Sequence, residues 1–84
     1  MHFDYTPAGV CSRHIEFEID AEGRLHNVRF TGGCHGNTQG IGALTEGMDA
    51  REAASRMCGI DCKARGTSCP DQLARAITEA LAAE

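Results

Sequence analysis

The sequence predicts an α+β domain, in which an antiparallel β-hairpin or small sheet is followed by three helices packed on one face. Two observations predict this class. Residues 12–20 alternate between polar and apolar side chains, which is typical of a strand with one buried face. After residue 37 the apolar residues recur at helical spacing, in three segments separated by Gly or Pro. The 84 residues have one composition throughout, so a single domain over residues 1–84 is expected.

A tight turn is predicted between the two strands of the hairpin. In the first strand, Arg13 shares its face with an apolar series, Ile15, Phe17 and Ile19. Gly23 closes the turn over residues 20–23, where it can adopt a positive φ. In the second strand, residues 24–31, Leu25 is out of phase with Val28 and Phe30, which predicts a β-bulge. Residues 3–6 are a further, weaker strand candidate.

The first helix is predicted from Asn37 to Gly47, with Ile41 and Leu44 on its buried side. Gly40 and Gly42 lie inside it, although each glycine costs roughly 1 kcal/mol of helix propensity relative to alanine. Their presence indicates close packing against a neighbouring element.

The other two helices are predicted from their caps. Asp49 is expected to cap the second helix, with Glu52 completing a capping box, and Gly59 ends it. Pro70 suits the first turn of the third helix, with Ser68 or Cys69 as its cap. The buried stripe of the third helix consists of Leu73, Ile77, Ala80 and Leu81.

Charge and hydropathy exclude several function classes. Twelve acidic and eight basic residues give a net charge of −4, which argues against a nucleic-acid partner. No apolar stretch is long enough to cross a membrane, and residues 1–5 do not resemble a secretory signal. We therefore expect a cytoplasmic protein with reduced thiols. Five cysteines in such a chain point to metal or redox chemistry.

Four cysteines are predicted to meet at the open end of the hairpin. With the turn centred near residues 21–22, Cys11 lies opposite residues 32–33, one step from Cys34. Cys34 precedes one helix and Cys69 begins another, where N–H groups and the helix dipole favour thiolates. The predicted metal ligands are Cys11, Cys34, Cys62 and Cys69. This set suits zinc, which we favour, or an iron–sulfur cluster.

Cys62 is the expected fourth ligand because it lies on a glycine-flanked loop shortly before Cys69. Lys63 and Arg65 would offset the charge of −2 that four thiolates leave on a divalent metal. The alternative is that the four cysteines are small buried apolar residues. Cys58 is expected to be buried at the end of the second helix rather than to bind metal.

The histidines and the remaining polar residues suggest no catalytic site. His14 and His26 are expected at the surface, whereas His35 is an alternative to one of the thiolates because it adjoins Cys34. No Ser-His-Asp set or carboxylate pair is placed for hydrolysis, so the chain is not expected to be catalytic alone.

Residues 66–71, Gly-Thr-Ser-Cys-Pro-Asp, contain the five letters that name the TSCPD domain. Residues 7–12, 30–34, 36–37 and 72–74 also agree, so the chain resembles the stand-alone, four-cysteine form of that domain. The same domain lies at the C-terminus of adenosylcobalamin-dependent ribonucleotide reductases. The resemblance implies an accessory module related to ribonucleoside-diphosphate reductase, whose partner is that enzyme or another redox or iron–sulfur protein. The chain is too short to hold the reductase barrel or a cobalamin site.

The order of cysteines, strands and helices is also similar to iron–sulfur scaffolds of the IscU/NifU type, which implies a SufE/NifU-like fold. The three scaffold cysteines correspond to Cys11, Cys34 and Cys69. Arg13 replaces the scaffold aspartate and Ser68 replaces its histidine, while Cys62 adds a fourth thiolate. A closed site of this kind suits structural or storage binding better than transfer. Two alternatives stay open: an iron–sulfur scaffold or carrier, and a dithiol redox protein using Cys62 and Cys69.

Overall fold

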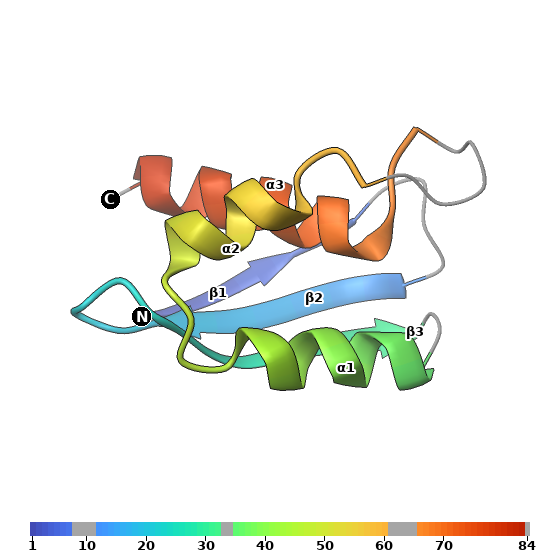
Figure 1. The fold of residues 1–84 in the computed structure, drawn as a ribbon, viewed down its shortest axis with the longest axis horizontal. Helices are drawn as coiled ribbons and strands as arrows, with labels where there is room; N and C mark the ends of the chain where they lie inside the picture. The colour runs from blue at the N-terminus through green and yellow to red at the C-terminus, as the bar shows by residue number, and fades with distance from the viewer. Residues whose placement is uncertain (8–11, 33–34, 61–65, 84) are drawn as a thin grey trace.

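Three strands and three helices make up the computed structural model, which describes residues 1–7, 12–32, 35–60 and 66–83. The strands form one antiparallel sheet in the order β1–β2–β3, and the helices follow along the chain (Figure 1). The elements are β1 (His2–Tyr5), β2 (Ser12–Ile19), β3 (Leu25–Gly32), α1 (His35–Thr45), α2 (Ala50–Met57) and α3 (Cys69–Ala83). The predicted α+β class is confirmed, and the leading strand is present as β1.

The β2–β3 hairpin has the predicted turn. Gly23 has a φ of +82°, and the Asp20 carboxylate accepts hydrogen bonds from the backbone N–H groups of Glu22 and Arg24 at 2.9 and 3.0 Å. Ser12 pairs with Gly32 at the open end of the hairpin. That pair lies in the register that was predicted from the turn.

A β-bulge interrupts β3 where Leu25 and Val28 are out of phase. Glu16 pairs with Arg29 but Glu18 pairs with His26, so β3 has one residue more than β2 over this stretch. Asn27, inside the bulge, has a φ of 54°. The extra residue lets Leu25 and Val28 both face the core, where they are 0% and 8% exposed. The predicted irregularity is confirmed.

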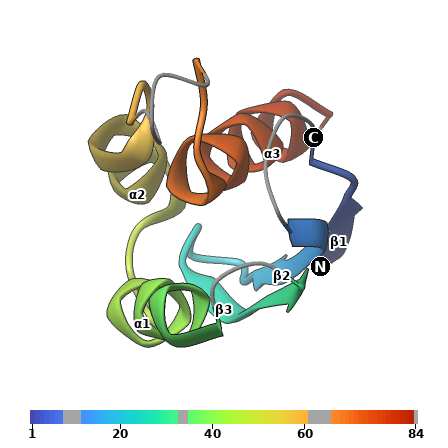
Figure 2. The ribbon, with the colours of Figure 1, turned by 90° about the vertical axis from the view of Figure 1, so that its right-hand side faces the viewer.

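The apolar face of the sheet packs against the helices. Ile15, Phe17 and Ile19 of β2 form one core cluster with Leu73 and Ile77 of α3. Figure 2 shows α2 and α3 over the sheet and α1 beside β3. The predicted stripe of α3 is confirmed, with Leu81 partly buried.

Arg13 is exposed, although the alternation placed it on the core face with Ile15. It lies in a register shift between Ser12 and His14, at the start of β2, and this shift breaks the strict alternation there.

Helix α1 meets β3 through one close approach. A Cβ atom at Gly42 would lie 2.8 Å from the carbonyl oxygen of Val28, so the predicted close packing is confirmed at that glycine. At Gly40 a Cβ would meet nothing within 4 Å, and the same prediction is wrong there. Leu44 is 80% exposed rather than buried, because α1 contacts β3 through the side that carries Gly42, whereas Ile41 is partly buried.

Asp49 caps α2 as predicted, with its carboxylate 3.0 Å from the backbone nitrogen of Glu52. The Glu52 carboxylate accepts a hydrogen bond from Nε of Arg56, at 2.8 Å, instead of turning back to the cap. Helix α2 ends at Met57 with Cys58 as its C-cap, and Gly59 follows with a φ of +85°. None of the helices in the described ranges is long and apolar enough to span a membrane.

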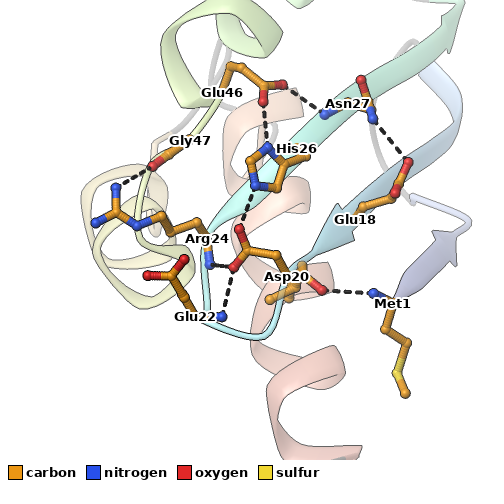
Figure 3. Close-up of polar contacts among 10 residues, drawn as sticks. Met1, Glu18, Asp20, Glu22, Arg24, His26, Asn27, Glu46 and Gly47 are labelled. Carbon is orange, nitrogen blue, oxygen red and sulfur yellow. Dashed lines mark hydrogen bonds and ion pairs between the residues drawn. The ribbon is translucent and has the colours of Figure 1, made fainter.

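At the closed end of the hairpin, His26 joins the turn to the end of α1 (Figure 3). Its Nε2 lies 2.7 Å from the Asp20 carboxylate and its Nδ1 lies 2.6 Å from Glu46. These two carboxylates raise the pKa of His26, Asp20 more than Glu46. The hydrogen bond from the Arg24 backbone, followed by the one from His26, lowers the pKa of Asp20 to about 2. His26 thus stabilises the hairpin, and its side chain is 34% exposed.

Replacing Asp20 with asparagine is expected to lower the pKa of His26 towards its ordinary value. The variant keeps an oxygen for the turn N–H groups but loses the charge beside the imidazolium. A raised folded-state pKa adds stability that is complete below the unfolded pKa and is lost as the pH rises through the folded one. The stability that Asp20 contributes through His26 is therefore largest in mildly acidic solution and fades as His26 deprotonates.

An NMR titration of the imidazole protons measures this effect directly. Asp4→Asn is the matched control, because Asp4 contacts His14 rather than His26. An unchanged His26 pKa in Asp20→Asn would show that Asp20 does not stabilise the protonated imidazole of His26.

Candidate metal centre

Cys69 is the predicted ligand that lies within the described residues. Cys11, Cys34 and Cys62 lie outside them, so the convergence of the four sulfurs stays a prediction. The described residues beside Cys11 and Cys34 are nevertheless paired. Ser12, which follows Cys11, pairs with Gly32, which stands two positions before Cys34. Helix α1 begins at His35, directly after Cys34.

Cys69 is the first residue of α3 and is partly buried. Ser68 is the cap of this helix, since its hydroxyl oxygen accepts a hydrogen bond from the Asp71 backbone N–H at 3.1 Å. The Ser68 carbonyl accepts from the Gln72 N–H at 2.8 Å. Ser68 is thus confirmed over Cys69 as the cap.

A buried polar network surrounds Asp71, which is 3% exposed. Its Oδ2 accepts hydrogen bonds from the Thr67 hydroxyl at 2.5 Å and from Nε of Arg75 at 3.1 Å. Its Oδ1 accepts from the Gly59 backbone N–H at 2.8 Å, and Gln72 Nε2 donates to the Thr67 hydroxyl oxygen at 2.9 Å. The Thr67 bond, followed by the Gly59 bond, holds the pKa of Asp71 below its usual range.

This network ties the end of α2 to the start of α3 and encloses the backbone of Cys69 between two anchored residues, Thr67 and Asp71. No role for Asp71 in such a network was predicted from the sequence. The available signal was its spacing, four residues after Thr67 and four before Arg75, which places all three on one side of the helix start.

Residues 2–81 match the sequence profile of the TSCPD domain. The chain belongs to the TSCPD domain family. No curated protein and no solved structure matches it significantly. In this TSCPD domain, all five name-giving residues lie at the start of α3: Thr67 and Asp71 form the buried network, Ser68 caps the helix, and Cys69 and Pro70 are its first two residues, as predicted for Pro70. The relations to ribonucleotide reductases and to IscU/NifU scaffolds stay predictions.

Cys58 is exposed in this TSCPD domain, so its predicted burial is wrong. The inward positions of α2 are taken by Ala53 and Met57, and residue 58 lies about 100° further around the helix. Cys58 borders a surface cavity of about 490 Å³ that also touches Thr78 and Leu81 of α3. Those two residues lie more than two helical turns after Cys69.

The histidine predictions agree with the structure where the side chains are described. His14 is 38% exposed and lies 2.8 Å from an Asp4 carboxylate oxygen on the outer face of the sheet. His26 belongs to the hairpin network. For His35, the alternative ligand, the structure describes the backbone at the start of α1 but not the side chain.

Proposed function

We propose that this TSCPD domain binds a metal through Cys11, Cys34, Cys62 and Cys69, and that it is an accessory module rather than an enzyme. Zinc is the preferred metal and an iron–sulfur cluster is the alternative. The observation that carries this proposal is the position of Cys69, in the first turn of α3 between two anchored residues. The hydrogen bonds of Thr67 and Asp71 fix the backbone on both sides of Cys69, so a ligand at this position is already placed before a metal binds.

The pairing of β2 with β3 also supports this site. The pairing of Ser12 with Gly32 keeps the chain next to Cys11 beside the chain that leads to Cys34. Four thiolates around zinc form a closed tetrahedral site, which is typical of structural zinc. Bound metal would supply a cross-link that a domain of 84 residues with a thin core can use.

The partner is proposed from the family alone. TSCPD domains in ribonucleotide reductases suggest docking to that enzyme or to a related redox protein in the cytoplasm. An iron–sulfur carrier remains the second candidate, because the order of cysteines, strands and helices in the sequence resembles that of the scaffolds. A dithiol redox protein is the third, since Cys62 and Cys69 stand only seven residues apart in the sequence.

Elemental analysis of protein purified without oxygen, and passed over a weak chelator, tests these candidates. We expect a colourless protein that retains stoichiometric zinc. A brown protein that contains iron and sulfide would contradict the zinc proposal and support the iron–sulfur carrier. A metal-free protein that forms a disulfide between Cys62 and Cys69 would contradict the zinc proposal and support the dithiol redox protein.

A further inference from the structure

Imidazole and carboxylate side chains gather on the face of the sheet that points away from the core. Side chains two positions apart in a strand share a face, so His2 and Asp4 lie together on β1, as do His14 and Glu16 on β2. Asp4 pairs directly with Glu16 across the two strands. In Figure 2, α2 and α3 lie over the opposite face of the sheet, and the four side chains are partly or fully exposed.

The ligand atoms of three of these residues converge. His2 Nε2 lies 3.6 Å from Asp4 Oδ2 and 3.6 Å from Glu16 Oε2. One donor atom from each of His2, Asp4 and Glu16 lies within 4.8 Å of the other two. A polar cavity of about 160 Å³, lined in part by His2 and Glu16, opens beside them. An ion could therefore reach all three atoms without backbone movement.

The charges on this face favour a cation. Like charges directly opposite each other destabilise a sheet, and Asp4 and Glu16 are such a pair. Arg29 stands opposite Glu16 on its other side, in β3, and borders the same cavity. Among the described residues, the ion-pair partners of Asp4 are His2 and His14. A divalent ion held by one neutral imidazole and two carboxylates would leave the ligand set neutral.

We propose that His2, Asp4 and Glu16 form a second metal site, separate from the cysteine centre, for a divalent transition ion such as zinc or manganese. A mixed imidazole and carboxylate set suits these ions, whereas magnesium and calcium prefer oxygen ligands alone. His14 is a positioning residue, because its ring nitrogen lies 2.8 Å from the Asp4 oxygen Oδ1, while the other oxygen, Oδ2, faces His2. Such carboxylate–histidine contacts orient metal ligands.

Titration of the intact protein with Mn²⁺, followed by NMR, tests this site without involving the thiolates. Thiolates bind manganese poorly, and the paramagnetic ion broadens only the signals near it. At substoichiometric Mn²⁺ we expect the signals of His2, Asp4 and Glu16 to broaden first, followed by those of His14. The signals of His26, at the hairpin turn, should stay sharp. Equal broadening around every exposed carboxylate would overturn the proposal, as would no broadening at all.

Variants separate the ligands from the positioning residue. Asp4→Asn should weaken Mn²⁺ binding by roughly a hundredfold, and His14→Ala by about tenfold. Glu46→Gln is the matched control, because Glu46 is also a half-exposed carboxylate beside a histidine, and it should leave the affinity unchanged. All three positions are at least one-third exposed, so the variants are expected to fold, which their amide spectra would verify. Equal effects of Asp4→Asn and Glu46→Gln would overturn the site.

Discussion

Replacement of Asp71 by alanine is expected to lower the free energy of unfolding by about 3 kcal/mol. The variant removes the acceptor of the Thr67 hydroxyl, the Gly59 backbone N–H and the Arg75 side chain at once. The Thr67 hydroxyl is buried beside Asp71, so it loses its partner without gaining a solvent contact, whereas Gly59 is exposed and its N–H can turn to water. Urea denaturation measures the loss.

Two controls identify the cause. Glu52→Ala removes the exposed ion pair of Glu52 with Arg56, which has the same spacing as the pair of Asp71 with Arg75, and should cost no more than about 0.5 kcal/mol. Asp71→Asn keeps one acceptor oxygen and should fall between alanine and the native residue. A cost for Asp71→Ala no larger than that of Glu52→Ala would show that the network does not hold the two helices.

The effect of Asp71 should also depend on pH. Because its pKa is lowered in the folded domain, Asp71 contributes its full stability above the usual carboxyl pKa and loses it as the pH falls through the folded value. The difference between the native protein and Asp71→Ala should therefore shrink in acid.

Cys62→Ala is expected to remove most of the bound metal from the purified protein. The change leaves three thiolates and opens a site that four would close. The metal-to-protein ratio after passage over a weak chelator measures the loss. Retention of the full metal content by Cys62→Ala would remove Cys62 from the ligand set.

Cys58→Ala is the matched control, because it removes the same side chain from the exposed C-cap of α2. We expect unchanged metal content and a change in stability within about 0.5 kcal/mol, as is usual at the surface. If the two variants behaved the other way round, the ligands would be Cys11, Cys34, Cys58 and Cys69. Cys62 would then be a thiol beside Lys63, and the redox candidate would gain support.

The hairpin could be predicted from the sequence because its signals are local. Alternation over β2, Gly23 in the turn, and the phase change between Leu25 and Val28 each depend on neighbouring residues. The helix caps at Asp49 and Ser68 are local in the same way. This is why the bounds of the strands and helices lie close to those predicted.

Features that depend on how the helices pack could not be predicted with the same success. Leu44 and Cys58 were both predicted to be buried on their helices, and both are exposed. The sequence of a short helix does not determine which side faces inward, because that depends on how the helix packs. The role of Asp71 depends on Gly59, twelve residues away. The cluster around Asp4 depends on the pairing of β1 with β2, to which the sequence pattern gave little weight.

The hydrogen bond between Gly59 and Asp71 closes a ring of chain that contains Cys62 and Cys69. In polymer terms, closing a ring of this length costs about 2 kcal/mol of chain entropy. In this domain the chain entropy is lost when the protein folds, so it does not have to be lost again when a metal binds. Under the proposed ligand set, the sulfurs of Cys62 and Cys69 would act as a chelate, so a metal that left one of them would still face a high local concentration of the other. A ring of this kind would favour slow release of the metal over rapid handover.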